Sequence, residues 1–288
     1  MSIFDLWRRK SGGADLEPAE ILDPEIALLS DVGCHRPVNQ DTGRVTLPAD
    51  EARRRARGVL IAVADGMGGQ QGGELASQWA IEVISRVYYE RNGDLTSDLV
   101  HAFQEANRHI HKNSIQDESL HGMGTTCTAL VLHNGQAHSG HVGDSRLYLV
   151  RGGEIYLMTE DHSAVMELVK QGVLTLEEAR HHTDRNVINR ALGTRSEVEV
   201  DTWNEPLPLK PGDHFLICSD GLYERVEDAE MKDAILSQPP PEACQALIDL
   251  AKQRGGYDNI TVAVARVEVR GNGEKKIARE TREVEVQA

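Results

Sequence analysis

Hydrophobic and polar positions follow two different periodicities along this chain, and the points of change divide it into blocks. Apolar runs bounded by turn residues at 25–33, 43–48 and 58–65 predict three successive strands. Apolar residues at helical spacing then predict two consecutive helices, over 73–90 and 98–115. The first half of the chain is therefore expected to hold a group of strands followed by a helix pair.

The second half follows a similar order with more strands. Residues 125–159 contain strand-like runs whose turns are marked by His-Asn-Gly and Arg-Gly-Gly, and residues 160–200 are polar and partly helical. A strand, two helices and a last strand follow at 213–221, 227–237, 241–255 and 258–269. Helix pairs that separate antiparallel blocks predict an α+β fold with helices packed on sheets, and a pure βαβ repeat does not fit.

Composition narrows the classes of protein to which this chain can belong. Its 288 residues are 40% apolar, enough to bury a sizeable core, but only 4% are aromatic, so the core must be mainly aliphatic. The formal net charge of −15 argues against nucleic acid as the main partner, because phosphate backbones call for a basic surface. An acidic balance fits a soluble protein, or one that holds several metal cations.

Three segments differ from the rest in composition. Residues 1–24 are expected to form a tail or linker, residues 25–267 a single globular domain, and residues 268–288 a charged tail. The arginine-rich stretch 48–58 lies between two predicted strands. It suits either a docking patch or a solvated hairpin loop, and we favour the loop.

The four cysteines and the hydropathy pattern indicate a cytoplasmic protein. The cysteines contain no CxxC pair, so we expect neither a zinc site nor a disulfide framework but four reduced thiols. No apolar run approaches the roughly 20 residues that span a bilayer. The apolar stretch at the start of the chain is too short for a signal peptide.

The stretch VLIAVADGMGGQQGG at 59–73 raises the question of function, because an aspartate stands where an apolar run meets a glycine-rich loop. Such loops often bind phosphate through bare backbone N–H groups. The glycines do not follow the GxGxxG spacing, however, and no Gly-Lys-Ser/Thr follows. A carboxylate at that position would also repel phosphate, so nucleotide binding is disfavoured.

A metal site explains Asp65 better, because the pattern recurs. Five aspartates each stand at the end of a predicted strand, where a rigid scaffold presents functional groups. Their ligand atoms would all be oxygen, which favours Mg²⁺ or Mn²⁺ over Zn²⁺. A single Asp-Gly pair would favour a turn, because both residues are common in turns for local reasons. The candidate ligands are Asp41, Asp65, Asp144, Asp220 and Asp258.

An arginine close to these carboxylates indicates a phosphorylated substrate. Arg36 lies five residues before Asp41. A guanidinium group matches the oxygens of a phosphate monoester in a bidentate geometry. Cys34 lies near Arg36, but the loop between them is too short for a cysteine-phosphatase site, and the surrounding aspartates would disfavour its thiolate.

Short motifs around these residues follow one another along the chain. They are Ser30-Asp-Val-Gly33 with Arg36, Asn39-Gln-Asp41, Ala64-Asp-Gly-Met-Gly-Gly69, Gly124-Thr-Thr126, Gly143-Asp-Ser-Arg146, Cys218-Ser-Asp-Gly221 and Asp258-Asn259. In this order they resemble the metal-dependent serine/threonine protein phosphatases of type 2C, in their bacterial form. The resemblance covers about residues 25–267 and implies a four-layer α-β-β-α sandwich, with two antiparallel sheets flanked by helices, and a flap at 160–200.

The resemblance also implies roles for the candidate residues. Asp65 would bridge two Mn²⁺ or Mg²⁺ ions, with the carbonyl of Gly66 on one ion and Asp220 and Asp258 on the other. Asp41 would order metal-bound waters, and Asp144 would help to bind a third, weaker ion. Arg36 would bind the substrate phosphate.

The implied activity is hydrolysis of phosphoserine and phosphothreonine in proteins by a metal-activated water. The partners would be a serine/threonine kinase and its substrates, with no nucleic acid and no stable membrane insertion, and we expect a monomer. The alternatives are a catalytically silent pseudophosphatase with a regulatory role, and a regulator phosphatase with one small protein substrate. Retention of every metal aspartate and of Arg36 favours catalysis over the silent form.

One position departs from the family pattern. Animal relatives carry a histidine after the Asp-Gly, proposed to protonate the leaving group, and this chain has Met67 there. His35, His141, His162 or a metal-bound water could serve instead, so the sequence leaves the acid open. It also leaves open the preferred metal and the physiological substrates.

Overall fold

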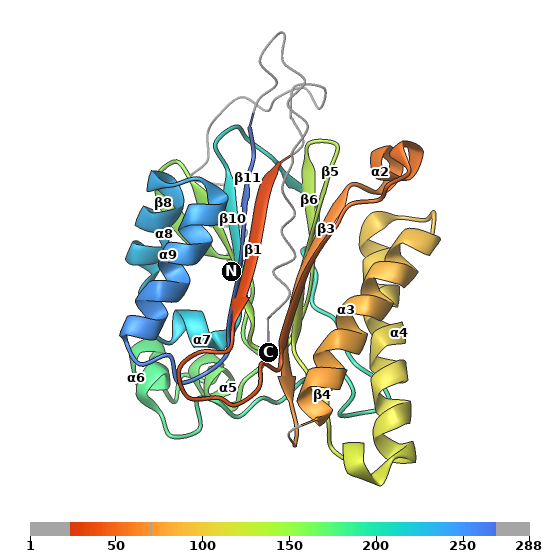
Figure 1. Cartoon of the computed structure of the whole chain (residues 1–288), viewed down its shortest axis with the longest axis vertical. Helices are drawn as coiled ribbons and strands as arrows, with labels where there is room; N and C mark the ends of the chain where they lie inside the picture. Colours follow the sequence, from red (N-terminus) through yellow and green to blue (C-terminus); the bar gives the residue numbers. More distant parts are fainter. Residues whose placement is uncertain (1–23, 70, 269–288) are drawn as a thin grey trace.

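The computed structural model describes residues 24–69 and 71–268. The two predicted tails lie outside the described residues, apart from Pro24 and Glu268. Within the described residues the chain forms two antiparallel sheets with helices on their outer faces, which confirms the predicted α+β sandwich (Figure 1).

The first sheet has five strands in the order β1-β11-β10-β7-β8. Its central strands β10 and β11 are antiparallel, so the end of one lies beside the start of the other. The strands are β1 (Glu25–Asp31), β7 (Arg146–Arg151), β8 (Glu154–Leu157), β10 (His214–Cys218) and β11 (Ile260–Arg266).

The second sheet has six strands in the order β2-β3-β5-β6-β9, with β4 paired to β3 outside this path. Since β6 belongs to this sheet and β7 to the other, the short β6–β7 loop crosses between the sheets. The strands are β2 (Asp41–Thr46), β3 (Val59–Met67), β4 (Gly124–Thr125), β5 (Cys127–His133), β6 (Gln136–Val142) and β9 (Leu207–Pro208).

Helices cover the outer face of each sheet, as Figure 1 shows. The long helices α3 (Gly72–Glu90) and α4 (Leu95–Gln116) pack on the second sheet. On the first sheet lie α8 (Asp228–Ser237) and α9 (Pro240–Gln253). None of the helices in the described ranges is long and apolar enough to cross a membrane. The smaller helices are α2 (Glu51–Arg57), α5 (Ala164–Lys170), α6 (Leu176–His181), α7 (Asp220–Tyr223) and the 3₁₀ turn η2 (Glu118–Leu120).

The central strands are apolar on both sides because each sheet is covered on both faces. Along β3, Leu60, Ala62 and Ala64 pack beneath the helices, whereas Ile61 and Val63 face the other sheet. Side chains of a strand alternate between faces, so a strand buried on both sides must be apolar at every position. This explains the unbroken apolar run that precedes Asp65.

The arginine-rich stretch 48–58 connects the antiparallel strands β2 and β3 and is mostly exposed, as predicted for a solvated hairpin connection, but part of it is a helix and not a loop. Residues Glu51–Arg57 form helix α2, which Asp50 caps by accepting a hydrogen bond from the Ala52 N–H. Arg57 is only 3% exposed, and its guanidinium lies 3.0 Å from the carboxylate of the equally buried Asp98. It also donates to the backbone oxygen of Tyr88 at 3.0 Å. One arginine of the stretch is therefore part of the core.

Replacing Arg57 should destabilise the fold much more than replacing its neighbours. The change Arg57→Ala would remove a buried side chain and one of the two arginines that pair with Asp98, with Arg91 remaining, so we expect a loss of about 2–3 kcal/mol in the free energy of unfolding. Arg53 is exposed on the same helix, and Arg53→Ala should change it by less than about 0.5 kcal/mol. Urea denaturation of both variants measures the difference, and equal losses would contradict a structural role for Arg57.

Candidate functional site

The pairing of β2 with β3 brings the first two candidate aspartates together. In this antiparallel pair Asp41, the first residue of β2, lies directly opposite Asp65 near the end of β3. Asp41 and Asp65 stand at the two ends of the β2–β3 hairpin in the sequence, and the strand pairing brings them side by side. Gly66 follows Asp65 within the same strand.

The first sheet contributes two more aspartates from the same end of neighbouring strands. Asp220 follows β10 after Ser219, and Asp258 stands two residues before β11. Because β10 and β11 are antiparallel, the end of β10 lies beside the start of β11, so Asp220 and Asp258 lie at the same end of the sheet. Asp144 comes from the β6–β7 loop, which crosses between the two sheets.

The electrostatics indicate that all five predicted aspartates share one site. Burial raises the pKa of Asp65 well above its ordinary value, and the nearby carboxylates of Asp41, Asp220, Asp144 and Asp258 raise it further. Burial also raises the pKa of Asp220, with Asp144 as the strongest neighbouring charge. Burial is the main cause that raises the pKa of Asp41 to about 6 and that of Asp144 to about 7.

Arg36 lies at the rim of this group. Its guanidinium is 2.8 Å from the Asp258 carboxylate, and half of its side-chain surface is exposed to solvent. The hydrogen bond to Asp258 is the main cause that raises the pKa of Arg36, and the charges of Asp220 and Asp65 contribute. The predicted phosphate-binding residue is therefore brought together with the predicted metal ligands.

The residues present fit divalent cations that prefer oxygen ligands. One buried carboxylate oxygen (Oδ1) of Asp144 and one of Asp220 have no hydrogen-bond partner. Buried unpaired carboxylate oxygens are costly unless something positive binds them. Within the described part of the chain no three acidic, histidine or cysteine side chains form a complete ligand group, so backbone and water oxygens would complete the coordination.

The backbone around Gly66 leaves no room for side chains. A Cβ on Gly66 would lie 2.0 Å from the carbonyl oxygen of Gly73, and a Cβ on Gly73 would lie 2.8 Å from the carbonyl oxygen of Gly66. Glycine at both positions keeps the Gly66 oxygen clear of side-chain atoms. This suits the Gly66 carbonyl as a cation ligand.

The residues that hold the aspartates in place could not be predicted from the sequence pattern. Thr126 binds Asp65 twice, because its N–H donates to the Asp65 carbonyl at 2.8 Å and its hydroxyl accepts from the Asp65 N–H at 3.0 Å. The same hydroxyl lies 2.7 Å from the hydroxyl of Ser145, beside Asp144. Thr126 thus connects strand β3, which carries Asp65, to the β6–β7 loop, which carries Asp144. Its place in the Gly124-Thr-Thr126 motif was the available signal.

Ser219 and Asn259 support the other members of the site. The hydroxyl of Ser219 donates to the Asp41 carboxylate at 2.7 Å and accepts from the Thr261 N–H at 3.0 Å. The Asn259 side chain donates to the carbonyls of Val32 and Val38, at 2.9 and 3.1 Å. It therefore closes the loop that carries Arg36. Both residues stand next to a candidate aspartate, but the sequence alone did not indicate their roles.

The three histidines near the site differ in their surroundings. His141 and His162 are buried, and burial lowers the pKa of His141 to about 3, which keeps it neutral. His35 is exposed next to Arg36, and its ring stacks on Tyr257 with centroids 4.7 Å apart. Met67 is half-buried at the end of β3. None of these positions identifies a leaving-group acid.

All four cysteines are free thiols, as predicted. Cys127, Cys218 and Cys244 are buried, and only Cys34 is exposed. The guanidinium of Arg36 binds Asp258 rather than forming an anion loop with Cys34. The cysteine-phosphatase interpretation therefore gains no support.

Comparison with known proteins agrees with this geometry. The family described as protein phosphatase 2C matches residues 38–264. The chain is 37% identical over 245 residues to protein phosphatase PhpP of Streptococcus pneumoniae, which covers 83% of this chain and 96% of that protein. It is 36% identical over 239 residues to the serine/threonine phosphatase stp of Listeria welshimeri, covering 81% and 92% of the two chains.

Solved structures of serine/threonine phosphatases superpose on this chain. The Mycobacterium tuberculosis serine/threonine phosphatase PstP/Ppp superposes with a TM-score of 0.77 and 37% identity, over 86% of this chain and all of that chain. A structure of the PstP catalytic domain in complex with two manganese ions superposes with a TM-score of 0.72 and 36% identity, over 85% and 98% of the two chains.

The raised pKa values predict how neutralising one carboxylate affects the metal-free protein. An aspartate with an ordinary pKa of 3.8 that is raised to about 7 on folding stabilises the fold only while it stays protonated. This contribution is lost as the pH rises through the folded-state pKa. In EDTA, Asp144→Asn should therefore stabilise the protein by about 1–2 kcal/mol near pH 8, and by less near pH 5.

Thermal unfolding of Asp144→Asn in EDTA at both pH values measures this effect. The exposed Glu82→Gln provides the control, because it removes one carboxylate outside the site. An equal shift in Tm for both variants, or one independent of pH, would contradict carboxylate repulsion as the cause.

Proposed function

We propose, on the premise that this chain belongs to the protein phosphatase 2C family, that it removes phosphate from phosphoserine and phosphothreonine side chains at a centre of two Mn²⁺ or Mg²⁺ ions. It is a metal-dependent protein serine/threonine phosphatase and thus a hydrolase. The observation that carries the proposal is the convergence of five aspartates from both sheets beside one arginine. Their retention, and the names of its relatives, leave the pseudophosphatase alternative without support.

The site residues divide into ligands and supports. Asp65, the Gly66 carbonyl, Asp220 and Asp258 would hold the two ions. When bound, these ions would acidify a water and neutralise charge on the phosphoryl group. Asp41 would order water, because Ser219 and its strand fix the carboxylate toward Asp65. Asp144 would contribute to a third, weaker ion.

The charge of the site explains why activity should depend on metal. Several carboxylates gathered in a partly buried site repel a phosphate dianion, and this repulsion is strong at low effective dielectric constant. Arg36 contributes a positive charge beside Asp258. Its guanidinium can bind phosphate oxygens at the rim and orient the ester toward the carboxylates.

The biological setting follows from the same chemistry and from the family. We propose that phosphoproteins are the substrates and that a serine/threonine kinase in the same cell produces them. The absence of a membrane-spanning helix from the described residues is compatible with a cytoplasmic site of action. We expect a monomer.

Metal removal and loss of Asp65 should both abolish hydrolysis. The wild type should hydrolyse p-nitrophenyl phosphate and a phosphothreonine peptide with Mn²⁺ or Mg²⁺, and EDTA should stop both reactions. The change Asp65→Ala removes a central carboxylate, so we expect kcat to fall by about 100-fold or more. Steady-state assays measure both effects, and activity that survives either treatment would contradict the mechanism.

Arg36→Ala should mainly weaken binding of the substrate phosphate. Loss of a charge-assisted bidentate contact should lower kcat/KM by about 10- to 100-fold. Arg36→Lys keeps the charge but not the fork geometry, so its loss should be intermediate. Arg108→Ala, on the outer surface of α4, is the matched control and should behave like the wild type. An unchanged kcat/KM in Arg36→Ala would refute the assigned role.

A further inference from the structure

The loop that carries Asp144 is held by a buried histidine. The backbone N–H of Gly143 donates to the ring nitrogen Nδ1 of His162 at 3.0 Å, and the backbone N–H of His162 donates to the Gly143 carbonyl at 2.8 Å. Gly143 has a φ of +112°, and a Cβ there would lie 2.5 Å from the Cβ of Thr126. The backbone before Asp144 is therefore confined between His162 and Thr126.

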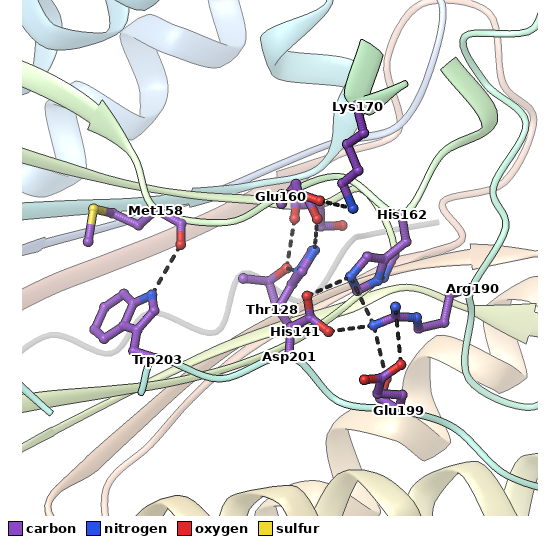
Figure 2. A network of polar contacts seen from close by, with 12 residues as sticks. Thr128, His141, Met158, Glu160, His162, Lys170, Arg190, Glu199, Asp201 and Trp203 are labelled. Carbon is purple, nitrogen blue, oxygen red and sulfur yellow. Dashed lines mark hydrogen bonds and ion pairs between the residues drawn. The ribbon is translucent and has the colours of Figure 1, made fainter. Parts of the chain in front are cut away.

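The other side of the His162 ring meets an acidic residue (Figure 2). Nε2 of His162 lies 3.1 Å from a carboxylate oxygen of Asp201. Asp201 is fixed in turn by paired backbone hydrogen bonds with His141, of 2.9 and 3.0 Å, and by a 2.5 Å ion pair with Arg190. Arg190 also contacts Glu199 at 3.5 Å.

These contacts determine which ring nitrogen carries the proton. A backbone N–H can only donate, so Nδ1 of His162 must accept from Gly143. The proton of the neutral ring is then on Nε2 and points to Asp201. Arg190 Nη1 also lies 3.1 Å from Nε2, and a guanidinium could donate only to an unprotonated Nε2. The ring proton would then stand on Nδ1 and oppose the Gly143 N–H, so the Gly143 contact and the Asp201 carboxylate together favour the proton on Nε2.

His162 also helps to join the two ends of the 160–200 segment, which we call its base. Its carbonyl accepts a hydrogen bond from the Asn189 N–H at 2.7 Å, and the Ala164 N–H donates to the Val187 carbonyl at 2.8 Å. Helices α5 and α6 lie between these two points. His162 therefore belongs to both the base of this segment and the support of Asp144.

We propose that His162, kept in its Nε2–H tautomer by Asp201, is a positioning residue that directs the Asp144 carboxylate toward Asp220. The proposal rests on the proposed function and adds a device for aligning one of its ligands. Asp144 needs such a device, because its buried Oδ1 has no hydrogen-bond partner of its own. The direction of the Asp144 carboxylate is therefore set by the backbone that carries it. Partners that orient ligands in this way typically change metal affinity about 10- to 100-fold when removed.

Two substitutions test the roles of the two ring nitrogens separately. In His162→Asn the amide oxygen can take the place of Nδ1 and still accept from Gly143. In His162→Gln the amide nitrogen can take the place of Nε2 and still donate to Asp201, but the acceptor for Gly143 is lost. We expect the weakest Mn²⁺-binding step, measured calorimetrically, to weaken about tenfold or more in His162→Gln and to stay near the wild-type value in His162→Asn.

Asp201→Asn tests the tautomer directly. An asparagine amide turned toward Nε2 would donate, so the ring proton would move to Nδ1 and oppose the Gly143 N–H. We expect weaker Mn²⁺ binding in Asp201→Asn, but not when the same change is made in His162→Asn, which has no tautomer to switch. Glu199→Gln is the matched control, because Glu199 is exposed and also pairs with Arg190.

Three outcomes would overturn the inference. One is a wild-type imidazole that carries its proton on Nδ1 in ¹H–¹⁵N NMR spectra of the metal-free protein. Another is a lower Tm in His162→Gln and Asp201→Asn with unchanged Mn²⁺ affinity, which would mean a purely structural role. The third is an undiminished effect of His162→Gln in an Asp144→Ala background. A wild type without Mn²⁺-dependent hydrolysis would instead refute the proposed function, while the NMR result would still decide the tautomer.

Discussion

Repulsion among clustered, partly buried carboxylates is the constraint on which this structure depends. Asp65 and Asp220 each have several negative neighbours, and burial removes much of the water that would screen them. Such a cluster persists only if the surrounding fold is stable enough to oppose it. The central strands provide that stability, because they are buried on both faces. Each packs against helices on one face and against the other sheet on the second face.

The same constraint explains why the supports are hydrogen bonds from short side chains. Thr126 and Ser219 hold Asp65 and Asp41 through contacts that involve the strand backbone. Short hydroxyl side chains lose little conformational entropy when they are fixed. The carboxylates are therefore positioned by the sheets themselves and not by long, adaptable side chains.

The sequence allowed prediction of an α+β fold and of the candidate ligands, because both leave local signals, whereas the four-layer sandwich was implied by the family resemblance. Unbroken apolar runs indicate buried strands, and a candidate aspartate such as Asp65 stands beside one end of several of them. The roles of Arg57 and His162 could not be predicted in this way. Each depends on partners far along the chain, Asp98 and Asp201, and no periodicity reports a contact between distant side chains. Helix α2 was missed because its charged surface resembles that of a loop.

The ion pair between Arg36 and Asp258 has a consequence for the end of the catalytic cycle. In the described structure the guanidinium already has a carboxylate partner at 2.8 Å. If Arg36 binds the substrate phosphate as proposed, the phosphate must share or displace that partner, and the carboxylate can pair with the guanidinium again when inorganic phosphate departs. Internal competition of this kind would weaken the binding of substrate and product alike. It would therefore favour rapid turnover over tight retention of phosphate.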